Sequence, residues 1–433
     1  MRVLLKNWFS LQYFLETNKA FSADTWTQAK GTFSGIGLFM GDKKRMFTRC
    51  AWHNDELFYD LNDEEKRVVH VTKDGWEIIK DSSVLFYRHV TMSAQVMPER
   101  GGKDLSILTK HYKFKHRDDV ILHIVSLITK FLVHVPHAID VLHGEKGASK
   151  TTSQRKDKSL VDPDRCDIRT IPKTKEDLAI MLDKHYFLCL DNITNISPEI
   201  SDLLCMAATG GAYAKRKLFS NDDETILEFL QAVSLNGINV VATKPDLLDR
   251  CILLELERLS PSERKTEKVL WDEFNADKPL ILGMIFTIIS RAMCIFPTVK
   301  LEALGRMADF TIWGYAVAEA AGIGGDKFLE AYLKNQSKAN TEAVEAQPVA
   351  FAILKLMHDR KDWTGNATAL LKELNVIAER EQIDTKSFQW VKQHNQLSRR
   401  LREVKSNLEQ LGLYVELKSN GGDRRIRIRN KNV

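Results

Sequence analysis

The sequence predicts an α/β protein with a parallel sheet in the middle of the chain. From residue 119 to about residue 332, short apolar strands alternate with helical segments, which is the pattern of a sheet covered by helices on both faces. Residues 1–118 contain aromatic and β-branched runs broken by turns, which predicts a β-rich N-terminal domain. Residues 349–433 show three helical segments followed by a β-hairpin, the order of a C-terminal winged helix-turn-helix.

Each element follows from an apolar run and the turns that bound it. The N-terminal β runs span residues 52–60, 67–79 and 84–88. In the middle region we expect strands at 139–142, 167–171, 186–190, 231–235 and 251–256, and a helix at 176–183. The C-terminal helices are expected at 349–358, 367–378 and about 395–411, and the hairpin at 413–418 and 424–429. The predicted domains are a β-rich domain at 1–118, a core at 119–258, a helical lid at 259–333, a polar linker at 334–348 and a winged helix at 349–433.

A glycine-rich turn after the strand at 139–142 is the first candidate site. It ends in Lys150 and Thr151, so backbone N–H groups and an ammonium can surround a triphosphate at the start of a helix. The spacing departs from the strict G-x-x-x-x-G-K-[ST] pattern, because Ser149 replaces the second glycine and Gly147 is an additional one. The residues predicted to bind ATP are Gly144, Glu145, Lys146, Gly147, Ala148, Ser149, Lys150, Thr151 and Thr152.

Polar side chains at the ends of two later strands extend this site. Asp191 follows an apolar strand, and its carboxylate together with the Thr151 hydroxyl can hold Mg²⁺. Asn236 ends the next strand and can reach the γ-phosphate or the attacking water. Asn192 stands where many such ATPases have a glutamate that polarises water, and an amide cannot accept a proton. The general base therefore stays open, and Glu224 is one candidate from elsewhere in the chain. In the alternative interpretation Asp191 and Asn192 are only helix or turn caps.

Three arginines, Arg250, Arg306 and Arg216, are candidates for stabilising charge on the departing phosphate. Arg250 precedes the strand at 251–256, a position that faces the neighbouring subunit in this kind of core. Arg306 begins a helix of the predicted lid. In the alternative interpretation each arginine forms a salt bridge with a nearby aspartate, Asp249 or Asp309.

Basic charge is concentrated in the last fifth of the chain. The formal net charge is +5, and residues 349–433 alone contain 17 Lys/Arg against 10 Asp/Glu, which indicates a polyanion-binding domain. On the helix at 395–411, an apolar stripe leaves Arg399 and Arg402 on the opposite face, where a recognition helix presents donors to DNA. A solvated charged face is the alternative. The hairpin adds Arg424, Arg425, Arg427 and Arg429.

Together these residues resemble the AAA+ helicase-like ATPases of bacterial mobile elements. Related proteins are the self-loading, minichromosome-maintenance-like helicases of staphylococcal cassette elements and pathogenicity islands and, more distantly, superfamily 3 helicases. The resemblance extends over roughly residues 50–433. Its blocks include Gly-Glu-Lys-Gly-Ala-Ser-Lys-Thr at 144–151, Leu-Asp-Asn at 190–192, Leu-Asn-Gly-Ile at 235–238, Pro-Asp-Leu-Leu-Asp-Arg at 245–250 and Arg-Met-Ala-Asp-Phe at 306–310.

The resemblance implies an AAA+ P-loop core that assembles into a homo-oligomeric ring, with a hexamer as the expected form and ATP between subunits. Arg250 would reach in from the neighbour as the arginine finger, and Arg306 would be the second sensor of the lid. The residues that would act in cis are Lys150, Thr151, Asp191 and Asn236.

The resemblance also implies single-stranded DNA in the pore, gripped by a hairpin before the strand that ends in Asn236. Here the hairpin is expected at residues 215–228, and its rising strand carries Lys215, Arg216 and Lys217. Its turn, Ser-Asn-Asp-Asp-Glu, is acidic and therefore a poor grip for phosphates. The hairpin residue that contacts DNA stays open.

We expect a cytoplasmic protein without a membrane partner. The apolar run at 279–289 is shorter than a bilayer span and predicts a buried helix. The N-terminus lacks a signal-peptide pattern, and the six cysteines, which show no CxxC, are expected to be buried thiols.

Three functions stay open from the sequence. The first is an ATP-driven DNA helicase or translocase that initiates replication of a mobile element. The second is a non-unwinding AAA+ switch, a loader or regulator whose ATP state controls assembly on DNA. The third is a DNA-binding protein with a degenerate core that only holds ATP, an interpretation supported by Ser149 and Asn192.

Overall fold

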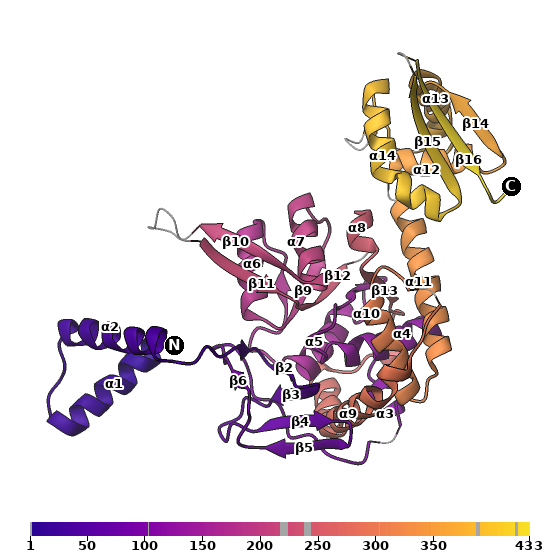
Figure 1. Ribbon diagram of the computed structural model, residues 1–433. Coiled ribbons are helices and arrows are strands. Elements are labelled where there is room, and N and C mark those ends of the chain that lie inside the picture. The colour runs from indigo at the N-terminus through magenta and orange to yellow at the C-terminus, as the bar shows by residue number, and fades with distance from the viewer. Residues whose placement is uncertain are drawn as a thin grey trace. The chain divides into compact units, whose positions relative to one another are not determined.

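The computed structural model describes residues 2–102, 104–216, 224–237, 244–302, 304–345, 347–386, 390–420 and 423–433. The chain divides into two compact units, Met1–Met46 and Phe47–Val433 (Figure 1). The first division therefore falls after residue 46 and not after residue 118.

The first unit is helical, so the prediction of a β-rich domain from residue 1 is wrong for this segment. It contains α1 (Arg2–Thr17) and α2 (Ala23–Phe39). Ser22 caps α2 by accepting a hydrogen bond from the Thr25 N–H at 3.1 Å. Aromatic rings of the two helices contact one another, for example Phe9 and Phe33 at a centroid distance of 6.0 Å. The predicted β runs all begin after residue 50. Before it, aromatic residues such as Phe9 and Phe33 pair the two helices instead.

The predicted β runs of residues 52–88 are strands. The first two runs form four strands of an antiparallel sheet in chain order: β2 (Cys50–His53), β3 (Glu56–Asp60), β4 (Val68–Thr72) and β5 (Gly75–Ile79). The short strands β1 (Met46–Phe47) and β6 (Leu85–Phe86) flank this sheet in the chain. Trp76 of β5 donates from its indole N–H to the hydroxyl of Thr287 at 3.0 Å. The sheet thus shares one hydrophobic core with the helices that follow and is no separate domain.

A five-stranded parallel sheet forms the middle of the second unit, as predicted. Its order, β13-β7-β12-β9-β8, brings the carboxyl ends of all five strands to one edge. The strands are β7 (Ile139–His143), β8 (Arg169–Thr170), β9 (Phe187–Ile193), β12 (Ala232–Gly237) and β13 (Cys251–Glu255).

Helices cover both faces of this sheet (Figure 1). On one face lie α4 (Arg117–Thr129) and α5 (Lys150–Val161). On the other lie α6 (Lys175–Lys184), α7 (Pro198–Thr209) and α8 (Pro245–Leu248). The remaining elements of this region are α3 (Ser106–Thr109) and the hairpin strands β10 (Gly211–Arg216) and β11 (Glu224–Phe229).

The predicted lid region is helical, with α9 (Glu267–Ile295), α10 (Ala308–Ala320) and α11 (Gly325–Glu345). Among the described residues, one helical stretch, Glu267–Thr298, is long and apolar enough to cross a membrane, and 61% of its apolar window is buried inside the protein. The apolar run predicted at 279–289 is therefore part of a longer apolar helix. The prediction that this run forms a buried helix is confirmed. Cys166 and Cys294 are exposed, so the prediction of buried thiols is wrong for these two cysteines.

The predicted linker at 334–348 is wrong, because α11 continues through it to Glu345. Asn335 is 6% exposed, and its amide donates to the Leu253 carbonyl at 2.7 Å and accepts from the Leu253 N–H at 2.9 Å. This side chain satisfies the open edge of β13 as a neighbouring strand would. Ala339 is also buried. The polar composition of the segment therefore reflects contact with a strand edge and not a tether.

The C-terminal region has its own hydrophobic core and the predicted order of elements. Three helices and a three-stranded antiparallel sheet of order β14-β16-β15 pack together. The apolar stripe of α14 is buried at Leu397, Leu401, Val404 and Leu408. The elements are α12 (Pro348–Leu356), β14 (Asp362–Gly365), α13 (Ala367–Arg380), α14 (His394–Gln410), β15 (Leu413–Asn420) and β16 (Asp423–Asn430).

Candidate functional site

The glycine-rich turn connects β7 to the N-terminus of α5. Gly144 has φ +139°, and a Cβ there would lie 2.6 Å from the Leu256 carbonyl oxygen, so a side chain does not fit. Ser149, at the position of the missing second glycine, adopts a left-handed conformation with φ 56°. The backbone thus has the conformation that a glycine would favour, and serine holds it at the cost of local strain. The irregular sequence therefore does not disrupt the turn.

Lys150 is the first residue of α5 and reaches back over the turn. Its Nζ donates hydrogen bonds to the carbonyl oxygens of Gly144 at 2.8 Å and Glu145 at 2.9 Å. Burial lowers the pKa of the Lys150 ammonium, and the nearby Asp191 carboxylate opposes this shift. A cation and the free N–H groups of a helix N-terminus thus meet beside the turn, the arrangement that binds phosphate.

Three predicted residues come together at the carboxyl edge of the sheet. The Thr151 hydroxyl lies 3.2 and 3.3 Å from the two carboxylate oxygens of Asp191. The amide nitrogen of Asn236, a side chain that is 2% exposed, lies 3.4 Å from the same hydroxyl. A hydroxyl and a carboxylate at this spacing are oxygen ligands of the kind that Mg²⁺ accepts, so the residues present fit the ion.

Asn192 occupies a backbone position that suits asparagine. Its φ is 55°, in the left-handed region where asparagine is enriched among non-glycine residues. Its N–H donates to an Asp191 carboxylate oxygen at 2.7 Å, which helps to fix that carboxylate. The local turn therefore favours asparagine independently of any role in activating water. Glu224, a conceivable base, has a side chain outside the described part of the structure.

Gln154 is a positioning residue that the sequence did not reveal. It is fully buried on α5, and its amide nitrogen donates to the carbonyl oxygens of Ser234 at 2.9 Å and Leu190 at 3.2 Å. These bonds tie α5 to β12 and β9, the strands that carry Asn236 and Asp191. The relative placement of Thr151 and these two side chains is thereby fixed.

Two further arginines lie beside the turn in the same chain. Arg258 lies 3.7 Å from the carboxylate of Glu145, the turn's single acid. The guanidinium of Arg264 lies 3.9 Å from the point where a Cβ of Gly147 would stand, and Arg264 has no ion-pair partner among the described residues. Both follow β13, which lies next to β7 in the sheet. Only this strand order, which the sequence does not give, places them at the turn.

Arg250 and Arg306 lie at the opposite edge of the sheet. The Arg250 carbonyl accepts from the Ile139 N–H, at the first residue of β7, whereas the turn follows the last. The two edges are about 17 Å apart, the length of a five-residue strand. The two arginines lie together here and not at this chain's own turn.

Aspartates hold these two arginines. The alternative interpretation is correct for Arg306 and Asp249, whereas the partner of Arg250 is Asp246 and neither of the two aspartates it named. Asp246 accepts from Arg250 at 2.9 Å and also bonds Arg306, and Asp249 accepts from Arg306 at 2.8 Å. The Arg250 side chain is 13% exposed and that of Arg306 is 43% exposed. Asp309, the other predicted partner, does not take part among the described contacts.

The predicted DNA-contacting arginines differ in what they already bind. Arg399 is 79% exposed on α14 with a loose contact to Glu403 at 3.6 Å, and Arg402 is exposed without an ion pair among the described residues. Arg427 is held by the carboxylate of Asp362 on β14, with the closest N–O distance 2.6 Å. Arg425 is exposed and has an interaction partner. The side chains of the other four predicted residues, Lys215, Arg216, Lys217 and Arg424, lie outside the described part of the structure.

Two protein-family descriptions match this chain. The family described as actinomycete integrative conjugative element replication protein matches residues 105–338, and the AICE RepA C-terminal domain matches residues 349–433. The first range contains the turn, Asp191, Asn236 and both pairs of arginines. No curated protein sequence matches the chain.

Several solved structures are similar to this chain at low identity. The C-terminal region of NrS-1 covers 86% of this chain and 96% of its own at 11% identity, with a TM-score of 0.36. The JCV helicase covers 51% and 58% at 11% identity, with a TM-score of 0.26. The RuvB Holliday junction branch migration motor of Thermotoga maritima covers 76% and 95% at 15% identity, with a TM-score of 0.25.

Proposed function

The chain belongs to the family of replication proteins of actinomycete integrative conjugative elements, and we propose that it is an ATP-dependent DNA helicase or translocase that acts as a ring when such an element starts to replicate. The observation that carries the proposal is the meeting of Lys150, Thr151, Asp191 and Asn236 at one edge of a parallel sheet. Within helicases we favour the self-loading, minichromosome-maintenance-like type with an AAA+ core and helical lid.

In each subunit the turn would hold the triphosphate. Backbone N–H groups and Lys150 would surround the β- and γ-phosphates, and Arg264 would add a second cation from the loop after β13. Arg258 would offset the negative charge of Glu145. Mg²⁺ bound by Thr151 and Asp191 would offset charge on the phosphate oxygens.

The attacking water would be oriented rather than deprotonated by the residues at this edge. The buried Asn236 amide is directed at the Thr151 hydroxyl and would bond the γ-phosphate or the water. Asn192 can bond water through its side chain but cannot take its proton. We therefore expect slow turnover unless a base comes from elsewhere.

The arginines at the other edge support an assembled site. Arg250 and Arg306 lie about 17 Å from their own turn, a strand length away, so they can stabilise a phosphate only at the turn of another subunit. Asp246 holds both guanidinium groups and would position them for that task. A contact of this head-to-tail kind generates a ring when it closes. This supports a homo-oligomer, with a hexamer as the proposed form.

The C-terminal region would bind duplex DNA as a winged helix. Its α14 presents Arg399 and Arg402 on the face opposite the buried leucines, as a recognition helix does. Arg427 is engaged by Asp362, so α14 and not this part of the wing would make the main contacts.

Replacing Arg402 by alanine is expected to weaken duplex binding and to lower the slope of log affinity against log salt by about one, because one phosphate contact is lost. Binding is measured by fluorescence anisotropy at several salt concentrations. Arg291→Ala, on the exposed part of α9, is the matched control and should leave the slope unchanged. An unchanged slope in Arg402→Ala would remove this residue from the interface.

A non-unwinding AAA+ switch is the second candidate, and Asn192 at the usual place of a catalytic glutamate favours it. A strand-displacement assay on the full chain separates the two functions. We expect ATP, and not its non-hydrolysable analogue, to drive displacement of a labelled strand from a forked duplex. ATP hydrolysis without displacement would favour the switch, and absence of hydrolysis would leave only a DNA-binding protein.

A further inference from the structure

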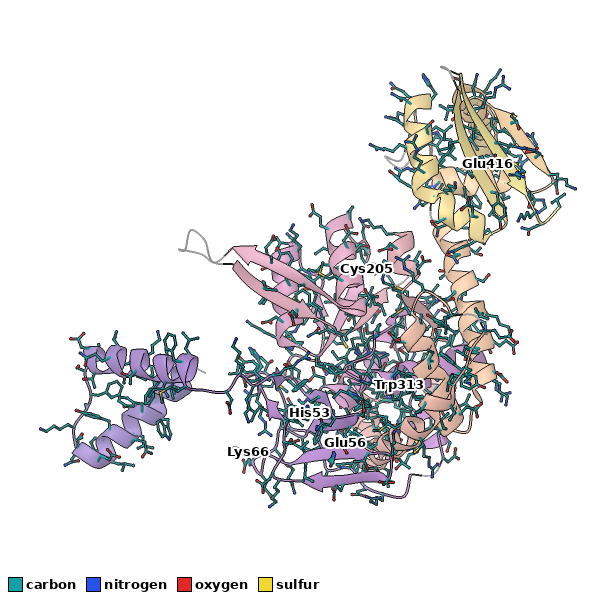
Figure 2. The ribbon with its side chains drawn as sticks, viewed as in Figure 1. His53, Glu56, Lys66, Cys205, Trp313 and Glu416 are labelled. Carbon is teal, nitrogen blue, oxygen red and sulfur yellow. The ribbon has the colours of Figure 1, made fainter. Side chains whose placement is uncertain are left out.

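A cavity of about 420 Å³ lies away from the nucleotide site, where the N-terminal sheet meets the helices. Its aromatic walls come from distant parts of the chain: Trp52 of β2, His134 after α4, Phe296 after α9, and Trp313 of α10. Figure 2 labels Trp313 and, at the β2–β3 hairpin, His53 and Glu56. The volume lies within the range of sites that hold small molecules or single side chains.

The two tryptophans form a right-angled corner. Their rings are 5.8 Å apart at an interplanar angle of 81°. Each is backed by another ring, since Trp52 stacks on His134 at 3.9 Å and Trp313 stacks on Phe296 at 4.1 Å. One face of each indole is thus covered, and His134 also meets Trp313 edge-on at 5.5 Å. Both indoles line the cavity, and their electron-rich rings attract cations.

Three charged side chains line the cavity around this corner. Asp55 lies in the turn between β2 and β3, Asp309 lies one helical turn before Trp313 on α10, and Lys73 lies in the β4–β5 turn. All three are exposed, and none has a side-chain ion pair among the described residues. The two carboxylates outnumber the ammonium, so the cavity carries a net negative charge.

The imidazole of His134 does not change this balance near neutral pH. Desolvation lowers its pKa to about 4, so it is uncharged at pH 7. A negative, aromatic-walled cavity disfavours nucleic-acid phosphates and suits a positively charged group.

We propose that this cavity binds an organic cation, a guanidinium or alkylammonium group, between the two tryptophans and the carboxylates of Asp55 and Asp309. The cation can be a basic side chain of another protein or a free polyamine. Both present the same chemistry to the cavity.

Isothermal titration of the full chain with N-acetyl-arginine amide tests the proposal. Its uncharged isostere, N-acetyl-citrulline amide, should bind at least ~10-fold more weakly, because charge-assisted hydrogen bonds and cation–π attraction are lost. This comparison leaves the protein unchanged and does not depend on the folding of a variant. Equal binding of the two compounds, or no saturable binding of the arginine compound, would overturn the proposal.

Variants that are expected to change the affinity for the arginine compound in opposite directions identify the site. Asp309→Asn and Asp55→Asn should each weaken binding of the arginine compound by ~10-fold. Lys73→Ala, which removes a like charge, should strengthen it roughly threefold. Asp326→Asn, an exposed acid at the start of α11, is the matched control and should have no effect. Unchanged binding in both cavity acid variants would refute this location.

Spermidine distinguishes the two sources of the cation. Tighter binding of the arginine compound indicates a protein side chain, and tighter binding of spermidine indicates a free polyamine. Adenosine monophosphate is the competing ligand. If it bound with the same affinity in the Asp55 and Asp309 variants and competed with the arginine compound, the cavity would be a base-stacking site and the proposal would be overturned.

Discussion

Replacing Lys150 by alanine is expected to lower the turnover of ATP at least ~100-fold, the usual cost of removing one charged group that stabilises a transition state. Lys150 supplies the ammonium at the turn, bonded to the carbonyl oxygens of Gly144 and Glu145. Phosphate release in a coupled assay measures this loss. Duplex DNA affinity, measured by anisotropy, should stay within about twofold, since the DNA-binding arginines lie on α14.

Lys327→Ala, an exposed lysine on α11, is the control for loss of a positive charge and should retain full turnover. If Lys150→Ala hydrolysed ATP at the rate of the unsubstituted protein, hydrolysis would come from another site or a contaminant. Both active functions, helicase and switch, would then lose their support. Loss of DNA binding in the same variant would indicate a folding defect and would call for Lys150→Arg.

The sequence predicts the local structure of those parts of the site that are contiguous in the chain. The turn from Gly144 to Lys150 is contiguous, so its place between a strand and a helix N-terminus could be inferred from spacing alone. Asp191 and Asn236 could be placed nearby because parallel strands end at one edge. The left-handed conformation of Ser149 was not visible in the sequence, although it explains why the irregular turn is tolerated.

The features that the sequence does not predict depend on contacts between segments that are distant in the chain. Arg258 and Arg264 reach the turn because β13 pairs with β7, and strand order cannot be inferred from apolar runs. Asn335 belongs to a stretch whose composition is that of a tether, yet its amide completes the edge of β13. The helices before residue 40 differ from the predicted β-rich segment because their aromatic rings pair with one another. In each case a tertiary contact gives a polar or aromatic residue its role.

Mixing two inactive variants is expected to restore part of the ATPase activity if the site is shared between subunits. Arg250→Ala subunits retain an intact turn, and Lys150→Ala subunits retain an intact Arg250. In an equal mixture that assembles at random, about a quarter of the head-to-tail interfaces combine the intact turn of one with the intact arginine of the other. Turnover should therefore rise to about a quarter of that of the unsubstituted protein.

Arg264→Ala is the matched control for this mixing experiment, because Arg264 lies at the turn of its own chain. Its defect and that of Lys150→Ala fall on the same half of the site, so their mixture should show no gain over the separate variants. A gain only with Arg250→Ala would place Arg250 in trans and Arg264 in cis. If neither mixture gained activity although the subunits exchanged, Arg250 would not act at the turn of another subunit. It cannot act at its own turn either, because a strand length separates the two. The guanidinium held by Asp246 would then serve only the fold of this edge.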